Sequence, residues 1–342
     1  MKKNNKINKI VILSVIGLIL TISLVIFILN YTKDSSSLSI LEKNWINTNM
    51  NNIIDVSVYN DVPVYGQNGK GVIFSYLEEF TNSYGVNFNK ISYVQGNDKD
   101  LRDLSFRILD FNADITDNDI NIYNDYYVIV SKDDSVLNNI NDLNEIKLGV
   151  LEADLTNIKY YLNEASDITY VACESVEEML EKINSKEQQI EYMAIPKMMY
   201  LDEILTNDLN IVYHISEIYK KYVITVNKND TLKSILNKYW MIYSNQYFDE
   251  KYKEYYLDTL FNNEEITEAE RMSYNGSAYT YGYVTNMPYE NTINKEFVGT
   301  ISNYLSRFED IADVDFKIVG YNSVPELKQA LSHGEVDLIF AN

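Results

Sequence analysis

The sequence predicts an α/β protein with two lobes, preceded by one transmembrane helix and followed by the beginning of a second copy of the same unit. Three observations support this. Short apolar strands alternate with amphipathic helices over residues 53–262, which is the pattern of a layered α/β domain. A stretch with the same order of elements returns after residue 272. An uncharged, mostly apolar run of 20 residues stands near the N-terminus, about the length that one bilayer-spanning helix needs.

The apolar run covers residues 10–29. Four lysines precede it, and the first acidic residue is Asp34. The positive-inside rule then places the N-terminus in the cytoplasm and the bulk of the chain outside. A cleaved signal peptide is the alternative, but no small-residue cleavage pattern follows the run. We expect a single-pass cell-membrane protein with a cytoplasmic N-terminus (1–9), a transmembrane helix (10–30) and a polar linker (31–52).

The first lobe is predicted from residues 53–128 and 222–262. Residues 54–59 are an apolar strand, and residues 71–84 are a helix because Phe74, Leu77 and Phe80 recur at helical spacing. We further expect strands at 86–94, 113–115, 126–131 and 222–228, and helices at 99–111 and within 232–261.

The second lobe is predicted from residues 131–218. Its expected strands are 146–151, 168–172 and 190–196, and its expected helices are 154–165 and 175–183. Ser175 and Glu178 have the spacing of a capping box. Asp154 and Thr156 open the other helix; they have two interpretations, an ordinary N-cap or open amides that bind a ligand.

Residues 281–290 repeat 56–65, with Pro288 opposite Pro63, and residues 297–308 repeat the helix that begins at residue 71. Residues 314–321 repeat the strand at 86–94, and residues 324–342 repeat the helix and strand that end at Asp114. An offset of about 225 to 228 residues is the size of a domain, so it indicates a tandem duplication. The second copy, residues 272–342, is truncated within its first lobe, and we expect the chain to be a fragment of a longer protein.

This order of elements resembles the family 3 solute-binding proteins, which have the periplasmic-binding-protein type II, or Venus-flytrap, fold. The resembling features are a strand ending before a Pro and an aromatic residue, a Gly-led helix, a helix with Gly-x-x-Asp before a strand, and a second α/β lobe. The resemblance covers residues 53–262 as one copy and residues 272–342 as part of another. It implies two lobes joined by crossing strands that close over a small ligand.

Candidate ligand-binding residues follow from that resemblance, because ligands bind where strand ends and helix N-termini meet. They are Tyr59, Asn60, Pro63 and Tyr65 after the first strand, Thr116 and Asn118 in the next loop, and Asp154 and Thr156.

Amino-acid-binding members of the family hold the ligand carboxylate with an Arg in a Thr-x-x-Arg motif. Here Thr116 matches the Thr, but Asp119 stands at the Arg position, and Pro196 stands near the usual position of the Asp that pairs with the ligand amine. Nearby acids would repel a ligand carboxylate. The resemblance therefore implies that the first copy binds a neutral or cationic solute or none, rather than an ordinary α-amino acid.

Composition narrows the remaining function classes. A formal net charge of -21 argues against a nucleic-acid partner. One cysteine, Cys173, and two histidines on different segments suggest neither a disulfide nor a metal site. No cofactor motif and no catalytic motif is present, so we expect no enzyme activity in this fragment.

Three functions stay open. The first is the extracytoplasmic sensor region of a signalling receptor whose kinase or cyclic-dinucleotide domain lies in a missing C-terminal part. The second is the substrate-binding component of an ABC transporter, and the third is a set of flytrap domains attached to a cell-wall lytic enzyme. The oligomeric state is left open, a dimer included.

Overall fold

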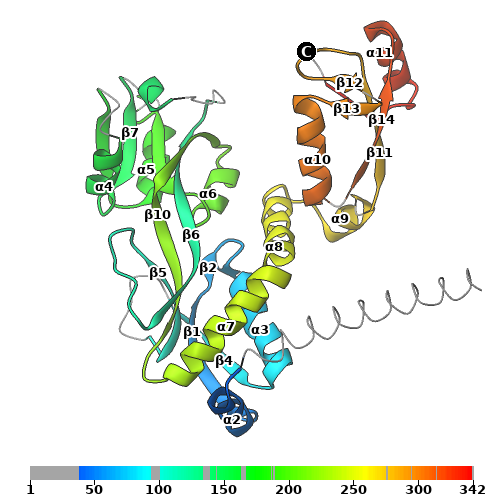
Figure 1. Cartoon of the computed structure of the whole chain (residues 1–342). Coiled ribbons are helices and arrows are strands. Elements are labelled where there is room, and N and C mark those ends of the chain that lie inside the picture. Colours follow the sequence, from blue (N-terminus) through cyan, green and yellow to red (C-terminus); the bar gives the residue numbers. More distant parts are fainter. Residues whose placement is uncertain are drawn as a thin grey trace, which may run out of the picture. The chain divides into compact units, whose positions relative to one another are not determined.

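The computed structural model describes residues 38–93, 101–133, 139–143, 145–162, 167–185, 187, 189–274, 276–293, 295–312 and 314–340. The α/β fold class is confirmed (Figure 1). The chain divides into two compact units. The first unit consists of Met1–Asn60, Ile73–Asn124 and Lys220–Phe248, and the second of Asp61–Val72, Asp125–Tyr219 and Asp249–Asn342.

The first unit is a sheet with helices on it. Its strands follow the order β4-β1-β5-β10, from β1 (Ile53–Tyr59), β4 (Asn87–Tyr93), β5 (Leu104–Leu109) and the end of β10 (Asn210–Val226). β1 pairs in parallel with β4 and β5, whereas β10 is antiparallel to β5. Its helices are α2 (Ile40–Asn49), α3 (Val72–Tyr84) and α7 (Asp230–Gln246).

Aromatic residues form much of the packing in the first unit. The rings of Tyr76 and Phe80, both on α3, are fully buried. They contact Tyr239, Trp240 and Tyr243 on α7 with ring centroids 5.1–5.6 Å apart. Buried aromatic side chains remove large apolar areas from water, so the predicted apolar face of the helix at 71–84 is confirmed as a core face.

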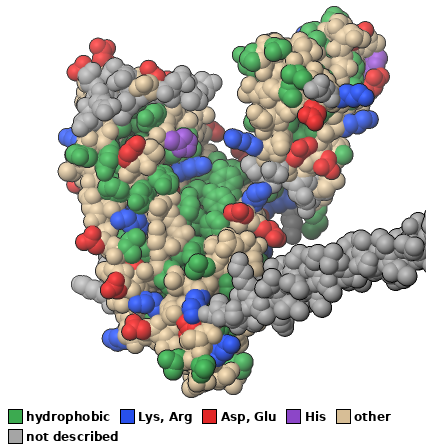
Figure 2. Space-filling view, in the orientation of Figure 1, with side chains coloured by type: hydrophobic (Ala, Val, Ile, Leu, Met, Phe, Trp, Pro, Cys, Tyr) green, Lys and Arg blue, Asp and Glu red, His purple; other side chains and the backbone are tan. Residues whose placement is uncertain are grey.

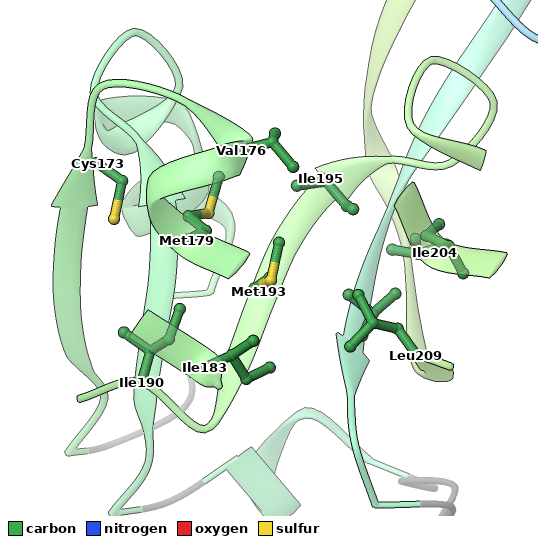
Figure 3. Packing of buried hydrophobic residues seen from close by; sticks show 11 residues of the cluster. Cys173, Val176, Met179, Ile183, Ile190, Met193, Ile195, Ile204 and Leu209 are labelled. Carbon is green, nitrogen blue, oxygen red and sulfur yellow. The ribbon is translucent and has the colours of Figure 1, made fainter. Parts of the chain in front are cut away.

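The second unit contains the strands β6 (Asp119–Ser131), β9 (Tyr192–Pro196), β7 (Lys147–Leu151) and β8 (Thr169–Cys173), in that order. β6 and β10 each begin in one unit and end in the other. The helices α4 (Leu155–Tyr161), α5 (Val176–Ile183) and α6 (Leu201–Thr206) join these strands, and a 3-10 turn spans Ile140–Leu143. In the core, Val176, Met179 and Ile183 of α5 lie over Met193 and Ile195 of β9 (Figure 3).

The C-terminal part of the second unit has its own small sheet. α8 (Phe248–Asn263) and α9 (Glu268–Tyr274) lead into three parallel strands in the order β14-β11-β15, namely β11 (Ala278–Tyr283), β14 (Asp315–Gly320) and β15 (Leu338–Ile339). α10 (Thr300–Ala312) and α11 (Val324–Ser332) connect them, and β12 (Asn291–Ile293) pairs with β13 (Glu296–Val298).

Two expected elements are wrong. Residues 104–109, expected within the helix at 99–111, form strand β5. Residues 113–115 are irregular and mostly exposed, directly after a turn that is closed by a hydrogen bond from Ala113 N to Asp110 O. β5 lies between β1 and β10, so hydrogen bonds on both sides override a local pattern that fits a helix. The strands expected at 126–131 and 222–228 are longer, because β6 starts at Asp119 and β10 at Asn210.

The expected transmembrane helix lies outside the described residues. Among the described helices, none is both long and apolar enough to cross a bilayer.

Candidate functional site

The loop after β1, residues 61–72, folds as a small hairpin that we call the lip loop. β2 (Asp61–Val62) pairs with β3 (Gly66–Gln67), and Val72 N donates to Val64 O at 2.9 Å. Gly71 closes the loop with φ 117°, and a Cβ atom there would lie 2.7 Å from the carbonyl of Tyr65. Only glycine fits such a backbone without strain. The expected first lobe included the lip loop, which here packs in the second unit.

The two candidate tyrosines, Tyr59 at the end of β1 and Tyr65 in the lip loop, are core residues in this structure. Tyr59 and Tyr65 are both 0% exposed. The ring of Tyr59 meets Tyr222 edge-on at 5.8 Å, and the ring of Tyr65 meets Tyr252 of α8 edge-on at 6.2 Å. Pro63 is also buried, and its carbonyl accepts from Tyr65 N at 2.7 Å. In this conformation only the half-buried Asn60, among the four candidates before and in the lip loop, presents surface to solvent.

Thr116 and Asn118 come together in an exposed turn organised by Asp119. The carboxylate of Asp119 accepts from Thr116 N at 2.9 Å, from Thr116 Oγ1 at 2.7 Å and from Thr225 Oγ1 of β10 at 2.6 Å. The side chain of Asn118 donates to Asn227 at 3.3 Å. At the position where the resemblance implies an Arg, the chain therefore has an anion that is itself bound by three donors.

Lysines from distant segments brace the same loop. Lys221 Nζ donates to the carbonyls of Phe111 and Ala113 at 2.8 Å, and Lys233 Nζ donates to Asp117 O at 2.8 Å. These lysines could not be predicted from the loop sequence, because residues 113–127 contain no Lys or Arg. The positive charge comes instead from β10 and α7.

In the second unit, Asp125 fixes the turn after β9. Its fully buried carboxylate accepts from Met198 N and Met199 N, each at 2.9 Å. The preceding residue, Lys197, lies with its Nζ 5.9 Å from the ring centre of Tyr256 on α8. Burial lowers the pKa of Lys197, although the Asp125 charge acts to raise it. From the sequence, Asp125 is one of the acids expected to repel a ligand carboxylate and Lys197 is not a candidate. The expected strand begins only at residue 126, so the sequence does not show that Asp125 lies buried at the centre of β6.

Polar contacts tie the lip loop and α8 to α6. Gln67 Nε2 donates to one oxygen of Asp202 at 2.5 Å, and Asn263 Nδ2 donates to the other at 3.3 Å. Thr206 Oγ1 in turn donates to Asn263 Oδ1 at 2.7 Å. Tyr252 lies with its hydroxyl 3.4 Å from the sulfur of Met198. The lip loop, α8 and the turn after β9 thus form one packed region of the second unit.

The last two candidates lie at the junction of β7 and α4. Asp154 is 5% exposed and precedes α4 as its N-cap residue, but its side chain does not make the capping hydrogen bond. Thr156 is exposed on the first turn. α4 has seven residues, so its dipole is small and an anion gains little there.

On the face drawn in Figure 2, acidic and basic side chains are scattered among neutral ones. A formal net charge of -21 favours solubility through repulsion between molecules.

No protein-family model matches the chain, and no curated protein matches its sequence. Among solved structures, the chain is similar to the BvgS periplasmic domain of B. pertussis, with 16% identity, a TM-score of 0.47 and coverage of 88% of this chain and 63% of that one. The chain thus spans less than two thirds of the length of that relative. It is also similar to the Bordetella pertussis BvgS periplasmic VFT2 domain, with 13% identity, a TM-score of 0.45 and coverage of 64% and 98%. A third is the amino acid ABC transporter substrate-binding protein AbpA from Streptococcus pneumoniae, bound to L-arginine, with 12% identity, a TM-score of 0.41 and coverage of 64% and 98%. None of these is named as an enzyme.

Proposed function

We propose that this chain is the extracytoplasmic solute-binding region of a membrane-anchored bacterial signalling receptor, built from a complete flytrap domain and part of a second one. The observation that supports this most directly is an internal duplication of packing residues at a nearly constant spacing. A receptor that combines two ligand-binding modules in one chain makes use of such a duplication, whereas a carrier that delivers one solute needs a single module.

The two sheets have the same order of parallel strands. In the first unit the second, first and third strands lie side by side as β4-β1-β5, and in the C-terminal part they lie as β14-β11-β15. Ile54 pairs with Phe88 in the first sheet, and Tyr279 pairs with Phe316 in the other. Parallel strands in one order with one register are characteristic of a repeated supersecondary unit.

The lip is duplicated as well. Gly299 lies 228 residues after Gly71 and has φ 124°, close to the 117° of Gly71. A Cβ at Gly299 would collide with the Tyr289 carbonyl, as one at Gly71 would collide with that of Tyr65. Each glycine follows two successive antiparallel contacts: β2–β3 and the Gln67–Lys70 bridge before Gly71, and the Asn286–Glu290 bridge and β12–β13 before Gly299. A backbone constraint of this kind is preserved because no other residue satisfies it.

The ligand class follows from the Asp119 turn. A solute carboxylate placed there would meet the charge of Asp119, which already accepts three hydrogen bonds. If a solute took one of these donors, the half-buried carboxylate of Asp119 would lose a hydrogen bond, which is unfavourable. The proposed ligand of the first domain is therefore neutral or cationic, or the domain serves without a ligand as a contact module.

Topology and binding test the proposal separately. Alkaline phosphatase fused after Asn342 of the full chain is expected to be active in living bacteria, because it folds only outside the cytoplasm. A fusion that accumulates in the cells but is inactive would contradict the anchored, extracytoplasmic arrangement. The purified full chain is then screened by thermal shift against neutral amides, polyamines and α-amino acids. A shift produced only by ordinary α-amino acids would contradict the proposed ligand class.

A further inference from the structure

One helical face of the C-terminal part is apolar and partly open: its Leu305 is buried and its Ile301 half-buried in the small core with Tyr281 and Tyr283, whereas its two aromatic residues are exposed. We call it the α10 face; it consists of Ile301, Tyr304, Leu305 and Phe308, which recur at i, i+3, i+4 and i+7. Tyr304 is 64% exposed and Phe308 44% exposed. The face borders a cavity of about 280 Å³, whose other walls come from β11, β14 and β15. An apolar stripe at helical spacing normally covers a core.

The first unit contains the same face with its cover in place. Ile73, Tyr76, Leu77 and Phe80 of α3 lie 228 residues before the members of the α10 face and are identical to them in type. All four are buried, with exposures of 1% or less.

α7 is the cover. Tyr76 donates its hydroxyl to Leu236 O at 2.9 Å. Its ring also lies against Tyr239, Trp240 and Tyr243, three aromatic residues on one side of α7, with centroids 5.4–5.6 Å away. This pairing defines what a matching helix must present: a backbone carbonyl within reach of the tyrosine hydroxyl, two adjacent aromatic residues, and a third aromatic residue one turn after the first.

Charge complements the aromatic contact in the first unit. Glu42, the third residue of α2, forms a capping box with Ser39. Its carboxylate also accepts from Ser234 Oγ at 2.6 Å and from Lys238 Nζ at 2.7 Å, both on α7.

The C-terminal part has the acid at the equivalent place. Thr267 and Glu270 lie 228 residues after Ser39 and Glu42, and they make the same capping contacts at the start of α9, between Thr267 N and Glu270 Oε2 at 2.8 Å and between Glu270 N and Thr267 Oγ1 at 3.3 Å. Glu270 is exposed. By its place in the repeat, Glu270 corresponds to the acid that accepts from Lys238 in the first unit, so it is the anion expected for a lysine on a covering helix.

We propose that the α10 face is a docking site for an amphipathic helix with the chemistry of α7, presenting its aromatic cluster to Tyr304 and Phe308 and a lysine to Glu270. The proposal rests on the duplication that supports the proposed function. It commits to a helix of that composition, and charge complementarity at Glu270 gives the helix its orientation.

The probe is a fluorescently labelled synthetic peptide of residues 229–247, added to the purified full chain and followed by fluorescence anisotropy. We expect saturable binding. Tyr304→Ala and Phe308→Ala should each weaken it at least about tenfold, since aromatic anchors dominate such interfaces. Tyr160→Ala, at an exposed tyrosine of α4, is the matched control and should leave the affinity unchanged. It also separates loss of the face from general loss of an exposed ring.

A charge exchange tests the orientation, and its first step uses the natural chain, so that step needs no variant chain to fold. A peptide with Lys238→Glu should bind the natural chain at least about tenfold more weakly and should recover affinity on a chain with Glu270→Lys. Absence of saturable binding would overturn the proposal, and so would binding that Tyr304→Ala leaves intact. Self-association of the chain that Tyr304→Asp abolishes would also overturn it, in favour of a second copy as the occupant. The phosphatase fusion is unaffected by any of these results, so the two proposals fail independently.

Discussion

Replacing Glu42 by glutamine isolates the contribution of one buried carboxylate to the first unit. Glu42 is 4% exposed, and burial by itself would raise its pKa. The hydrogen bonds from Lys238, Ser234 and Ser39 outweigh burial and lower the pKa from 4.5 to about 2. A shift of that size corresponds to roughly 3 kcal/mol. Because the side chain of Lys238 is 33% exposed, solvent screening reduces our expectation to about 1.5–2 kcal/mol.

The pH dependence follows from the direction of this shift. A carboxylate whose pKa is lower in the folded state stabilises that state fully above its unfolded pKa, here 4.5, and loses the effect as the pH falls toward about 2. Glu42→Gln should therefore lower the free energy of unfolding by about 1.5–2 kcal/mol at pH 7, and the difference from the natural chain should shrink steadily between pH 5 and pH 2.

Tryptophan fluorescence during urea unfolding measures this directly, because both tryptophans, Trp45 on α2 and Trp240 on α7, lie in the first unit. The matched control is Glu270→Gln, which removes the same capping carboxylate from exposed α9 and should leave the tryptophan transition unchanged. A loss at pH 7 below about 0.5 kcal/mol, within the range of ordinary surface substitutions, would refute the reasoning. An equal loss at pH 3 and pH 7 would also refute it, since the effect would then not depend on the charge.

Three further predictions concern the lip loop, the Asp119 turn and the second core. Gly71→Ala should destabilise the chain by about 2 kcal/mol or more through strain at φ 117°. Gly69→Ala should cost only about 1 kcal/mol, because a Cβ there meets nothing within 4 Å. Thermal unfolding followed by circular dichroism compares the two variants, and equal losses of stability would contradict the steric argument. Asp119→Ala should lower the free energy of unfolding by about 1–2 kcal/mol, since three donors lose their acceptor. Hydrogen exchange at Thr116 N should also become faster, and unchanged protection there would show that another group holds the turn. Cys173 is 1% exposed, and burial raises the pKa of its thiol although the charge of Lys182 acts to lower it. Its reaction with a thiol reagent at pH 8 should therefore be at least about a hundredfold slower in the folded chain than in urea. Comparable rates would mean that the core around α5 is accessible to solvent.

Most elements could be predicted from the sequence because their periodicity is strong. The helix at 71–84, the strand at 86–94 and the helix at 175–183 are confirmed by α3, β4 and α5. The capping prediction at Ser175 is confirmed in part. Its side chain accepts from Glu178 N at 3.3 Å, but the carboxylate of Glu178 accepts from Glu174 N instead of closing the box. The strand β5 was missed because its apolar residues fit a helix equally well, and only its place between two other strands decides the matter.

The candidate site was harder to predict because partners lie far apart in sequence. The pattern around Tyr59 and Tyr65 indicates a strand followed by a loop, but not that Tyr222 and Tyr252 cover these two rings. Likewise, an acidic loop without a basic residue indicates a solvated loop, but Lys221 and Lys233 from other segments donate to its backbone carbonyls. Periodicity reports which residues share a face. It does not report which element covers that face.

The duplication separates the residues that build the scaffold from those that distinguish the copies. Among the positions that agree between the copies are a strained glycine, one capping acid and an apolar stripe, and each of these is required for folding. Gln67, whose side chain donates to Asp202, is the half-buried edge of a loop whose preceding residues 62–66 are buried. Breaking this contact leaves the β2–β3 pairing and the hydrogen bond from Val72 N to Val64 O in place. A solute that displaces the lip loop must therefore break the Gln67 contact with α6 and also uncover the ring of Tyr65, which packs against Tyr252, and the second change costs more because it exposes apolar surface.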